Sequence, residues 1–164
     1  MRLKRARRAA GLTALVLSQA AGVGKSLVSI LESGQGRVPR LHTLERLATV
    51  LRMSPSHLAF GIDHPFEVVE QLRCDGFAAR LQAARLERGL KMRAVDSLAG
   101  VSPGSTRSLE AGTMPSLDTL ELITQALKVS PAWLAYGEGP RELRKRGTIT
   151  TRTTGADHFP PSGG

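Results

Sequence analysis

Cysteine is nearly absent from this chain, and aromatic residues are scarce. Cys74 is the single cysteine among 164 residues, and aromatic residues make up only 4%. One thiol excludes an internal disulfide and cannot build a metal site alone, which is typical of a reducing compartment. We therefore expect Cys74 to be an incidental linker thiol and the chain to be cytoplasmic.

The chain also lacks a long apolar run and any grouped set of catalytic side chains. No stretch of about 18 apolar residues is available for a membrane span. Gly11, Gln19 and Gly22 interrupt the segment after the basic N-terminus, which does not fit a secretory signal. The histidines are scattered, and no carboxylate pair or metal-ligand spacing occurs. We expect no catalytic site, no metal, no cofactor and no membrane partner.

What the chain does contain is an internal repeat. Residues from Leu3 to Gly34 recur 78 positions later, and residues from Pro39 to Gly61 recur 76 positions later. Two copies of about 60 residues are near the lower limit for domains that fold without metal or disulfides. We expect a first copy, a linker, a second copy and a flexible basic tail, at 1–61, 62–76, 77–137 and 138–164.

Each copy has the pattern of short helices joined by small turns, so we predict an all-α fold. Ser54-Pro55, Ser102-Pro103 and Ser130-Pro131 each place a capping hydroxyl before a proline that suits the first helical position. The predicted helices of the first copy are 2–10, 14–21, 25–33, 42–52 and 55–60. Those of the second copy are 78–88, 92–99, 103–111, 117–128 and 131–136. The apolar residues of the linker favour a further short helix that packs one copy on the other.

Positive charge is concentrated in the first copy. The net charge of +9 divides into +8 for the first copy, −3 for the linker, +2 for the second copy and +2 for the tail. A cationic surplus favours a polyanionic partner, because neutralising phosphates releases counterions. Taken alone the signal is weak, since a basic face is often only solvated surface.

Both copies carry segments that point to one family. The first copy contains AAGVGKSLVSILESG and SPSHLAFG, and the second contains LAGVSPGSTRSLEAG and SPAWLAYG, with a P-x-L-x-T-L helix start between the two segments of each copy. These segments resemble the Cro/phage-repressor (XRE) family of helix-turn-helix DNA-binding domains. The resemblance implies two tandem five-helix, lambda-repressor-like domains of a bacterial or phage-encoded, nucleoid-associated protein. Its partner would be a double-stranded DNA operator.

In that family the second helix of the turn, called the reading helix below, lies in the major groove. The resemblance places the base-reading positions of the first copy at Lys25, Ser26, Ser29 and Ile30. In the second copy it leaves only Ser105 and Arg107, so this copy is a degenerate reader or reads a different sequence weakly. Lys25 can donate to guanine, although a phosphate contact or plain exposure is equally open. The string GVGKS does not fit a phosphate-binding loop, because Gln19 stands where that motif needs glycine.

The resemblance also assigns supporting roles. Phosphate contacts are expected from Thr13, Arg37 and Arg40, whose loop is shortened to GTMP in the second copy. Structural ion pairs between helix one and the end of the reading helix are expected for two pairs of residues, Arg7 with Glu32 and Arg85 with Glu110. Asp96 lies where family members cross two helices closely, so its carboxylate must reach solvent or find a donor.

Trp133 and Tyr136 lie in the last helix, where family members often dimerise, and they are the candidate contacts of a homodimer. Two arrangements remain open: the copies act as a pseudo-dimer on one asymmetric site, or the first copy reads DNA while the second makes a homodimer. The charge asymmetry, the shortened loop and Pro103-Gly104 favour the homodimer arrangement, which predicts a palindromic operator read mainly by the first copy. The expected function is a sequence-specific transcriptional regulator, most simply a repressor that occupies a promoter. The alternative is an antitoxin or antiactivator that binds a protein partner.

Overall fold

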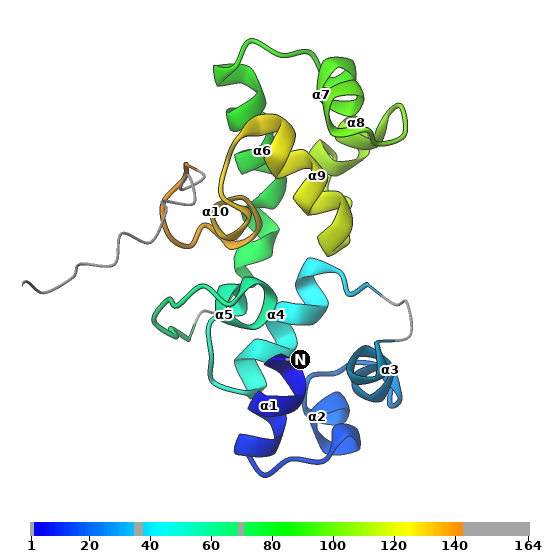
Figure 1. Ribbon diagram of the computed structural model, residues 1–164, viewed down its shortest axis with the longest axis vertical. Coiled ribbons are helices and arrows are strands. Elements are labelled where there is room, and N and C mark those ends of the chain that lie inside the picture. Colours follow the sequence, from blue (N-terminus) through cyan, green and yellow to red (C-terminus); the bar gives the residue numbers. More distant parts are fainter. Residues whose placement is uncertain (1, 35–37, 69–70, 143–164) are drawn as a thin grey trace, which may run out of the picture.

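The structure is a computed structural model that describes residues 2–34, 38–68 and 71–142. Within these residues the chain folds into two successive five-helix bundles, one from each copy (Figure 1). The first copy forms α1 Arg2–Ala9, α2 Ala14–Ala20, α3 Leu27–Ser33, α4 Leu41–Val50 and α5 Pro55–Phe60. The second forms α6 Phe77–Glu87, α7 Met92–Ala99, α8 Ser105–Glu110, α9 Leu117–Leu127 and α10 Pro131–Tyr136. The predicted all-α fold with two tandem helix-turn-helix units is confirmed.

The two reading helices, α3 and α8, begin two residues later than the sequence predicted. Lys25 and Ser26 form a turn before α3. In the second copy Gly104 precedes α8 with φ of 86°, a left-handed conformation that glycine adopts without strain and that does not continue a helix. Lys25 therefore lies ahead of its helix rather than within the first helical turn.

Each bundle is fastened by an ion pair between its first and third helices. Arg7 Nε and Nη2 donate to the two carboxylate oxygens of Glu32, each at 2.7 Å, and Arg7 Nη1 donates to the Leu12 carbonyl at 2.7 Å. Arg85 repeats this arrangement with Glu110, at 2.6 and 3.0 Å. The hydrogen bond from Arg7, opposed by burial, holds the pKa of Glu32 below its usual value. Both pairs expected from the resemblance are thus present, in almost the same geometry.

A second arginine in each copy closes the bundle, and the sequence did not indicate it. Arg2 on α1 donates from its guanidinium to the carbonyls of Leu58 and Ala59 in α5. Arg80 on α6 donates in the same way to the two equivalent carbonyls of α10. Carbonyls near a helix C-terminus lack helical partners and carry partial negative charge, so a guanidinium fits there.

The linker differs from the predicted helix. Residues 62–68 are not helical, and the Val68 side chain is 83% exposed. Among the described residues of the linker, only Arg73–Gly76 is helical, as one short 3-10 turn, η1. Pro65 disfavours helical backbone in the residue before it and lacks a donor itself, which accounts for the extended start.

Cys74 is a core residue rather than the incidental linker thiol expected from the sequence. Its side chain is fully buried, and its backbone N–H donates to Glu45 Oε2 at 2.9 Å. The N–H of Arg73 donates to the other oxygen of the same carboxylate. Burial, and then the neighbouring Glu45, raise the pKa of the thiol. The linker is therefore anchored on α4 by a buried carboxylate.

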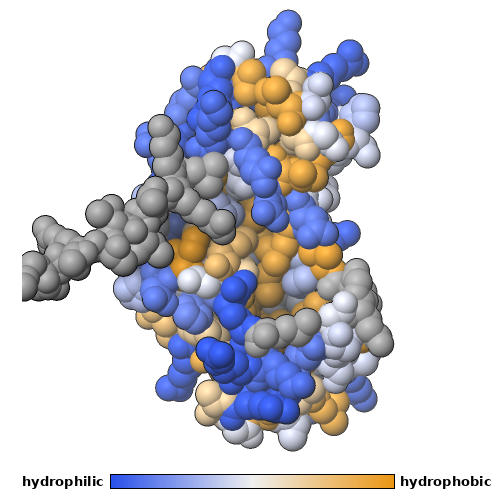
Figure 2. Space-filling view, viewed as in Figure 1, coloured by the Kyte–Doolittle hydropathy of each residue, from blue (hydrophilic) through white to orange (hydrophobic). Residues whose placement is uncertain are grey.

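The two copies meet through equivalent residues. Phe60 ends α5 and Tyr136 ends α10, at matching positions of the repeat, and their ring centroids are 6.4 Å apart. Arg40 and Ser116, which also match, form an antiparallel bridge between the two copies. The Tyr136 hydroxyl donates to the Leu41 carbonyl at 3.3 Å. Figure 2 shows apolar residues gathered at this junction between the two copies, which is called the waist of the molecule below. Contacts between like positions are those of a two-fold dimer, here made within one chain.

This arrangement corrects the expectation for Tyr136. Its side chain is only 2% exposed, so the contact that it makes is with the first copy of the same chain and not with a second molecule. Trp133 is half-buried, and the guanidinium of Arg141 stacks over its ring at 4.7 Å.

The expected tail begins later than residue 138. Glu138 is 1% exposed, and the N–H of Ser130 donates to the Arg141 carbonyl at 2.7 Å. Residues 138–142 therefore pack on the second copy. The remainder of the predicted flexible tail, 143–164, lies outside the described residues.

We predict that Tyr136→Ala lowers the free energy of unfolding by about 3–5 kcal/mol, because it empties an aromatic site between the two copies. Tyr136→Phe, which removes only the hydroxyl, should cost about 1 kcal/mol. Urea unfolding followed by circular dichroism measures both. Equal costs for the two variants would contradict the packing of the ring at this junction.

Candidate nucleic-acid interface

The reading helices of both copies lie on one side of the molecule. In Figure 1, α3 and α8 are on the right-hand flank, one below and one above the waist. Each helix is held by buried apolar side chains, Val28 in α3 and Leu109 in α8. Ser29 of α3 and Arg107 and Ser108 of α8 are exposed and can contact a ligand. A long polyanion along this flank would meet both helices.

The first copy presents a polar reading surface. Lys25 and Ser26, in the turn before α3, and Ser29, on α3, are exposed, whereas Ile30 is half-buried. Thr13 caps α2, since its hydroxyl accepts from the Val16 N–H at 3.2 Å. Its hydroxyl hydrogen stays available for a phosphate oxygen.

Arg40 belongs to the first copy and also lies close to the second. It is exposed, it precedes α4, and it borders a hollow of about 350 Å³ beside α3 that Leu27 and Thr43 also line. It also borders a hollow of about 600 Å³ beside α8, whose walls otherwise come from the second copy. Arg37, the other arginine expected to hold phosphate, lies outside the described residues.

Asp96 finds three donors at the start of the second reading helix. Its carboxylate accepts from the N–H of Gly104 at 2.8 Å, from the N–H of Thr106 at 2.8 Å and from the Thr106 hydroxyl at 2.6 Å. Burial raises the pKa of Asp96, but these hydrogen bonds outweigh it and hold the pKa below the usual value. The charge that the sequence identified as needing a partner therefore fixes α7 to the first turn of α8.

The first copy lacks this fastening. Ser18 is the equivalent of Asp96 and is fully buried, yet its hydroxyl has no hydrogen-bond partner within the described part of the chain. Ser26, at the start of α3, makes no side-chain capping bond either. The start of α8 is thus held by more hydrogen bonds than the start of α3.

The second copy carries cations that the sequence comparison did not single out. Lys91 and Arg93, at the start of α7, are exposed together with Arg107 of α8. Arg93 and Arg107 border a hollow of about 500 Å³ with Asp96 at its base. In the first copy, the positions equivalent to the two arginines are Leu15 and Ser29. A comparison of the copies position by position, rather than with the family pattern, would have found Arg93.

Within residues 2–34, 38–68 and 71–142, His, Cys, Asp and Glu do not gather in groups of three that could hold an ion. None of the helices in these ranges has the length and apolar character that a bilayer span needs.

We predict that Asp96→Asn lowers the free energy of unfolding by about 2 kcal/mol at neutral pH, because bonds to the charged form are lost. The pKa of Asp96 is lowered on folding, so its contribution is present above the unfolded pKa of about 3.9 and disappears as the pH falls through the folded value. The difference between wild type and Asp96→Asn should therefore be constant above about pH 5 and shrink below about pH 4.

Asp118→Asn is the matched control, because Asp118 is an exposed carboxylate in the first turn of α9. It should cost less than about 1 kcal/mol. Urea unfolding at several pH values gives all three curves. A pH-independent deficit in Asp96→Asn would show that the hydrogen bonds do not depend on the charge.

Comparisons with known proteins agree with this geometry. Residues 1–60 match a family described as helix-turn-helix domain, and residues 81–134 match one described as helix-turn-helix. Over 74 residues the chain is 44% identical to the HTH-type transcriptional regulator PrtR of Pseudomonas aeruginosa. The match covers 45% of this chain and 29% of that protein, so the chain spans less than a third of the length of this relative. No solved structure matches the chain. The chain belongs to the XRE-type helix-turn-helix family of DNA-binding domains and carries two of them in tandem.

Proposed function

We propose that the protein is a sequence-specific double-stranded DNA-binding transcriptional regulator that represses by occupying a promoter. The observation that carries this proposal is that both reading helices lie on one flank of the molecule (Figure 1) and that polar and cationic side chains of both copies are exposed at these helices. The relative with 44% identity is named a transcriptional regulator, which supports the same class.

The first copy supplies most of the nonspecific affinity. Its net charge of +8 is the largest of any segment, and such a surface attracts the phosphate backbone at any sequence. We assign phosphate contacts to Thr13, which caps α2, and to Arg40, which borders a hollow beside α3, and such contacts would set the orientation of α3 on the duplex. The affinity from this source falls steeply with salt.

Base reading in the first copy depends on the residues ahead of and along α3. Lys25, exposed in the turn before the helix, can donate to guanine O6 and N7. Ser26 and Ser29 can donate or accept, and Ile30 offers an apolar contact to a thymine methyl group. A regulator that reads bases in this way blocks polymerase simply by remaining bound.

The first test is selection of bound duplexes from a random DNA pool near physiological salt, followed by sequencing. Enrichment of a defined motif is expected, because base contacts persist where nonspecific phosphate binding weakens. Absence of any enriched motif would contradict sequence-specific binding and would favour a protein partner instead.

We predict that Lys25→Ala relaxes the preference at one base position of the enriched motif, with a cost of about 1–3 kcal/mol on the preferred sequence. Nonspecific affinity should change little. Lys128→Asn is the control, because it removes one exposed lysine at the far end of α9, where a left-handed φ of 48° suits asparagine. An equal loss on every sequence would mark Lys25 as a phosphate contact.

A further inference from the structure

We infer that one chain is a complete pair of DNA readers, which binds the two unlike halves of a single asymmetric operator as an intramolecular pseudo-dimer. This inference rests on the proposed DNA-binding function. It departs from the sequence-based preference for a homodimer on a palindrome, and it assigns DNA contacts to the second copy.

The first support is the symmetry of the junction. Besides the Phe60 and Tyr136 rings, the strand-like segments before α4 and α9 run antiparallel, with the Leu41 N–H donating to the Pro115 carbonyl at 3.4 Å. Like elements of the repeat therefore face one another across an approximate two-fold axis. Two-fold related reading helices are the arrangement that proteins use to enter successive major grooves on one side of the duplex.

The second support is the burial of this junction. Leu41 is fully buried and Tyr136, whose hydroxyl donates to the Leu41 carbonyl across the junction, is 2% exposed. Glu138 follows α10, yet its carboxylate accepts from the Ser56 N–H of the first copy at 3.2 Å. A junction with buried apolar and charged groups is fixed rather than transient, and it covers the end of α10 that a second chain would need.

The third support is that the second copy has a reading helix with a fixed start and exposed arginines beside it. Asp96 holds the start of α8 through hydrogen bonds from both Gly104 and Thr106. Arg93 and Arg107 stand exposed beside the hollow that Asp96 also lines. A well-ordered reading helix with two flanking guanidinium groups has the means to contact bases and phosphates, whereas a mere dimerisation unit would need neither.

The two halves of the site must differ. Lys25 of the first copy corresponds to Pro103 of the second, and Ser29 corresponds to Arg107. A lysine ahead of the reading helix and an arginine within it both suit guanine, but they stand at different positions of the reading helix and so read different base positions. The operator half bound by each copy should therefore have its own sequence.

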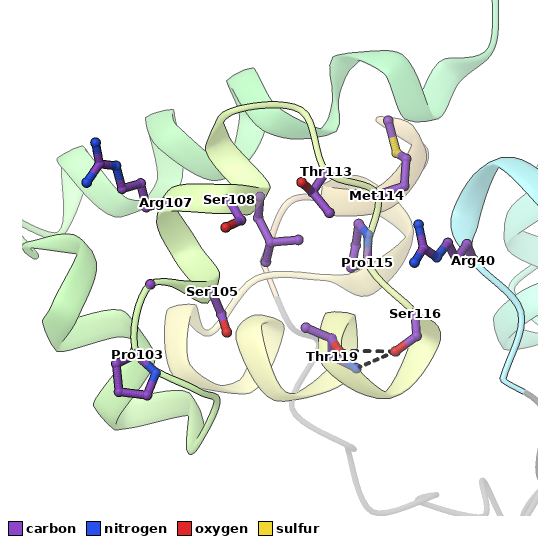
Figure 3. Close-up of a pocket in the computed structure, with 12 residues that line it drawn as sticks. Arg40, Pro103, Ser105, Arg107, Ser108, Thr113, Met114, Pro115, Ser116 and Thr119 are labelled. Carbon is purple, nitrogen blue, oxygen red and sulfur yellow. Dashed lines mark hydrogen bonds between the residues drawn. The ribbon is translucent and has the colours of Figure 1, made fainter.

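Arg40 lies between the two copies. It can therefore contact a phosphate in the operator half bound by the second copy as well as one in the half bound by the first. Figure 3 shows Arg40 reaching from the first copy toward Pro115 and Ser116 of the second. The hollow of about 600 Å³ that it borders is also lined by Ser105 and Thr119, from α8 and α9. The second copy has no arginine of its own in the shortened GTMP loop. Arg40 supplies a cation for a phosphate at this place.

The test is made on the duplex enriched by the selection, with single-position variants of each copy. Arg107→Ala should weaken binding by about 10- to 100-fold and relax the preference at one base position in one half of the motif only. Lys25→Ala should relax the preference at one base position in the other half. Placing random sequence in the Arg107 half of the duplex should remove the effect of Arg107→Ala and leave the effect of Lys25→Ala. Both side chains are exposed, and thermal melting checks that each variant is folded.

Stoichiometry decides between one chain and two. Sedimentation or native mass spectrometry of the complex should give one 17.5 kDa chain per duplex, and the free protein should have the mass of one chain. An enriched palindrome that holds two chains would overturn the inference while leaving the proposed function intact. A motif that Arg107→Ala leaves unchanged would overturn it as well. Absence of any enriched motif would instead remove the proposed function on which it rests.

Discussion

The placement of the two copies depends on the hydrogen bonds of two buried carboxylates. Glu45 is 2% exposed and accepts from the backbone N–H groups of Arg73 and Cys74, while Glu138 is 1% exposed and lies 3.3 Å from the Arg73 guanidinium. Arg73 also accepts, through its carbonyl, from the guanidinium of Arg80 at 2.9 Å. A buried charge is costly unless its oxygens are bonded. Both oxygens of Glu45 accept hydrogen bonds, whereas Glu138 Oε1 has the ion-pair contact with Arg73 but no hydrogen bond within the described residues. The bonds to Glu45 therefore permit few alternative positions for the linker. Since the linker joins the two bundles, its fixed position also limits how the bundles can be placed relative to one another.

The copies resemble one another in what holds them folded and differ in what they show to a ligand. The pair of Arg7 and Glu32 and its counterpart in the second copy have nearly the same geometry, as do the clamps made by Arg2 and Arg80. The side chains exposed on the reading flank, by contrast, are redistributed between the copies. Such a division is expected where both copies must fold but each meets a different partner surface, because buried networks tolerate change less than exposed positions do.

The sequence was sufficient to predict features that recur in both copies and features that depend on neighbouring residues. Turn glycines, Ser-Pro caps and apolar spacing gave helix ends within about two residues, and the arginine and glutamate at matching positions indicated the ion pairs. It could also state that Asp96 needed a donor. It could not identify the donor, because the hydrogen bonds of Thr106 depend on how α7 crosses α8. Burial of Cys74 and Tyr136 depends on how one copy docks on the other, and no local pattern encodes that choice.

The contrast between Asp96 and Ser18 bears on how each copy meets DNA. In the second copy a charged acceptor holds the first N–H groups of the reading helix, so little freedom remains to be lost on binding. In the first copy the equivalent hydroxyl is unbonded within the described residues, and the start of α3 has fewer restraints. Ordering that segment on DNA would cost conformational entropy, which the larger positive charge of the first copy can offset. On this argument the first copy gives affinity and adapts to its site, whereas the second brings a preformed surface to a neighbouring groove.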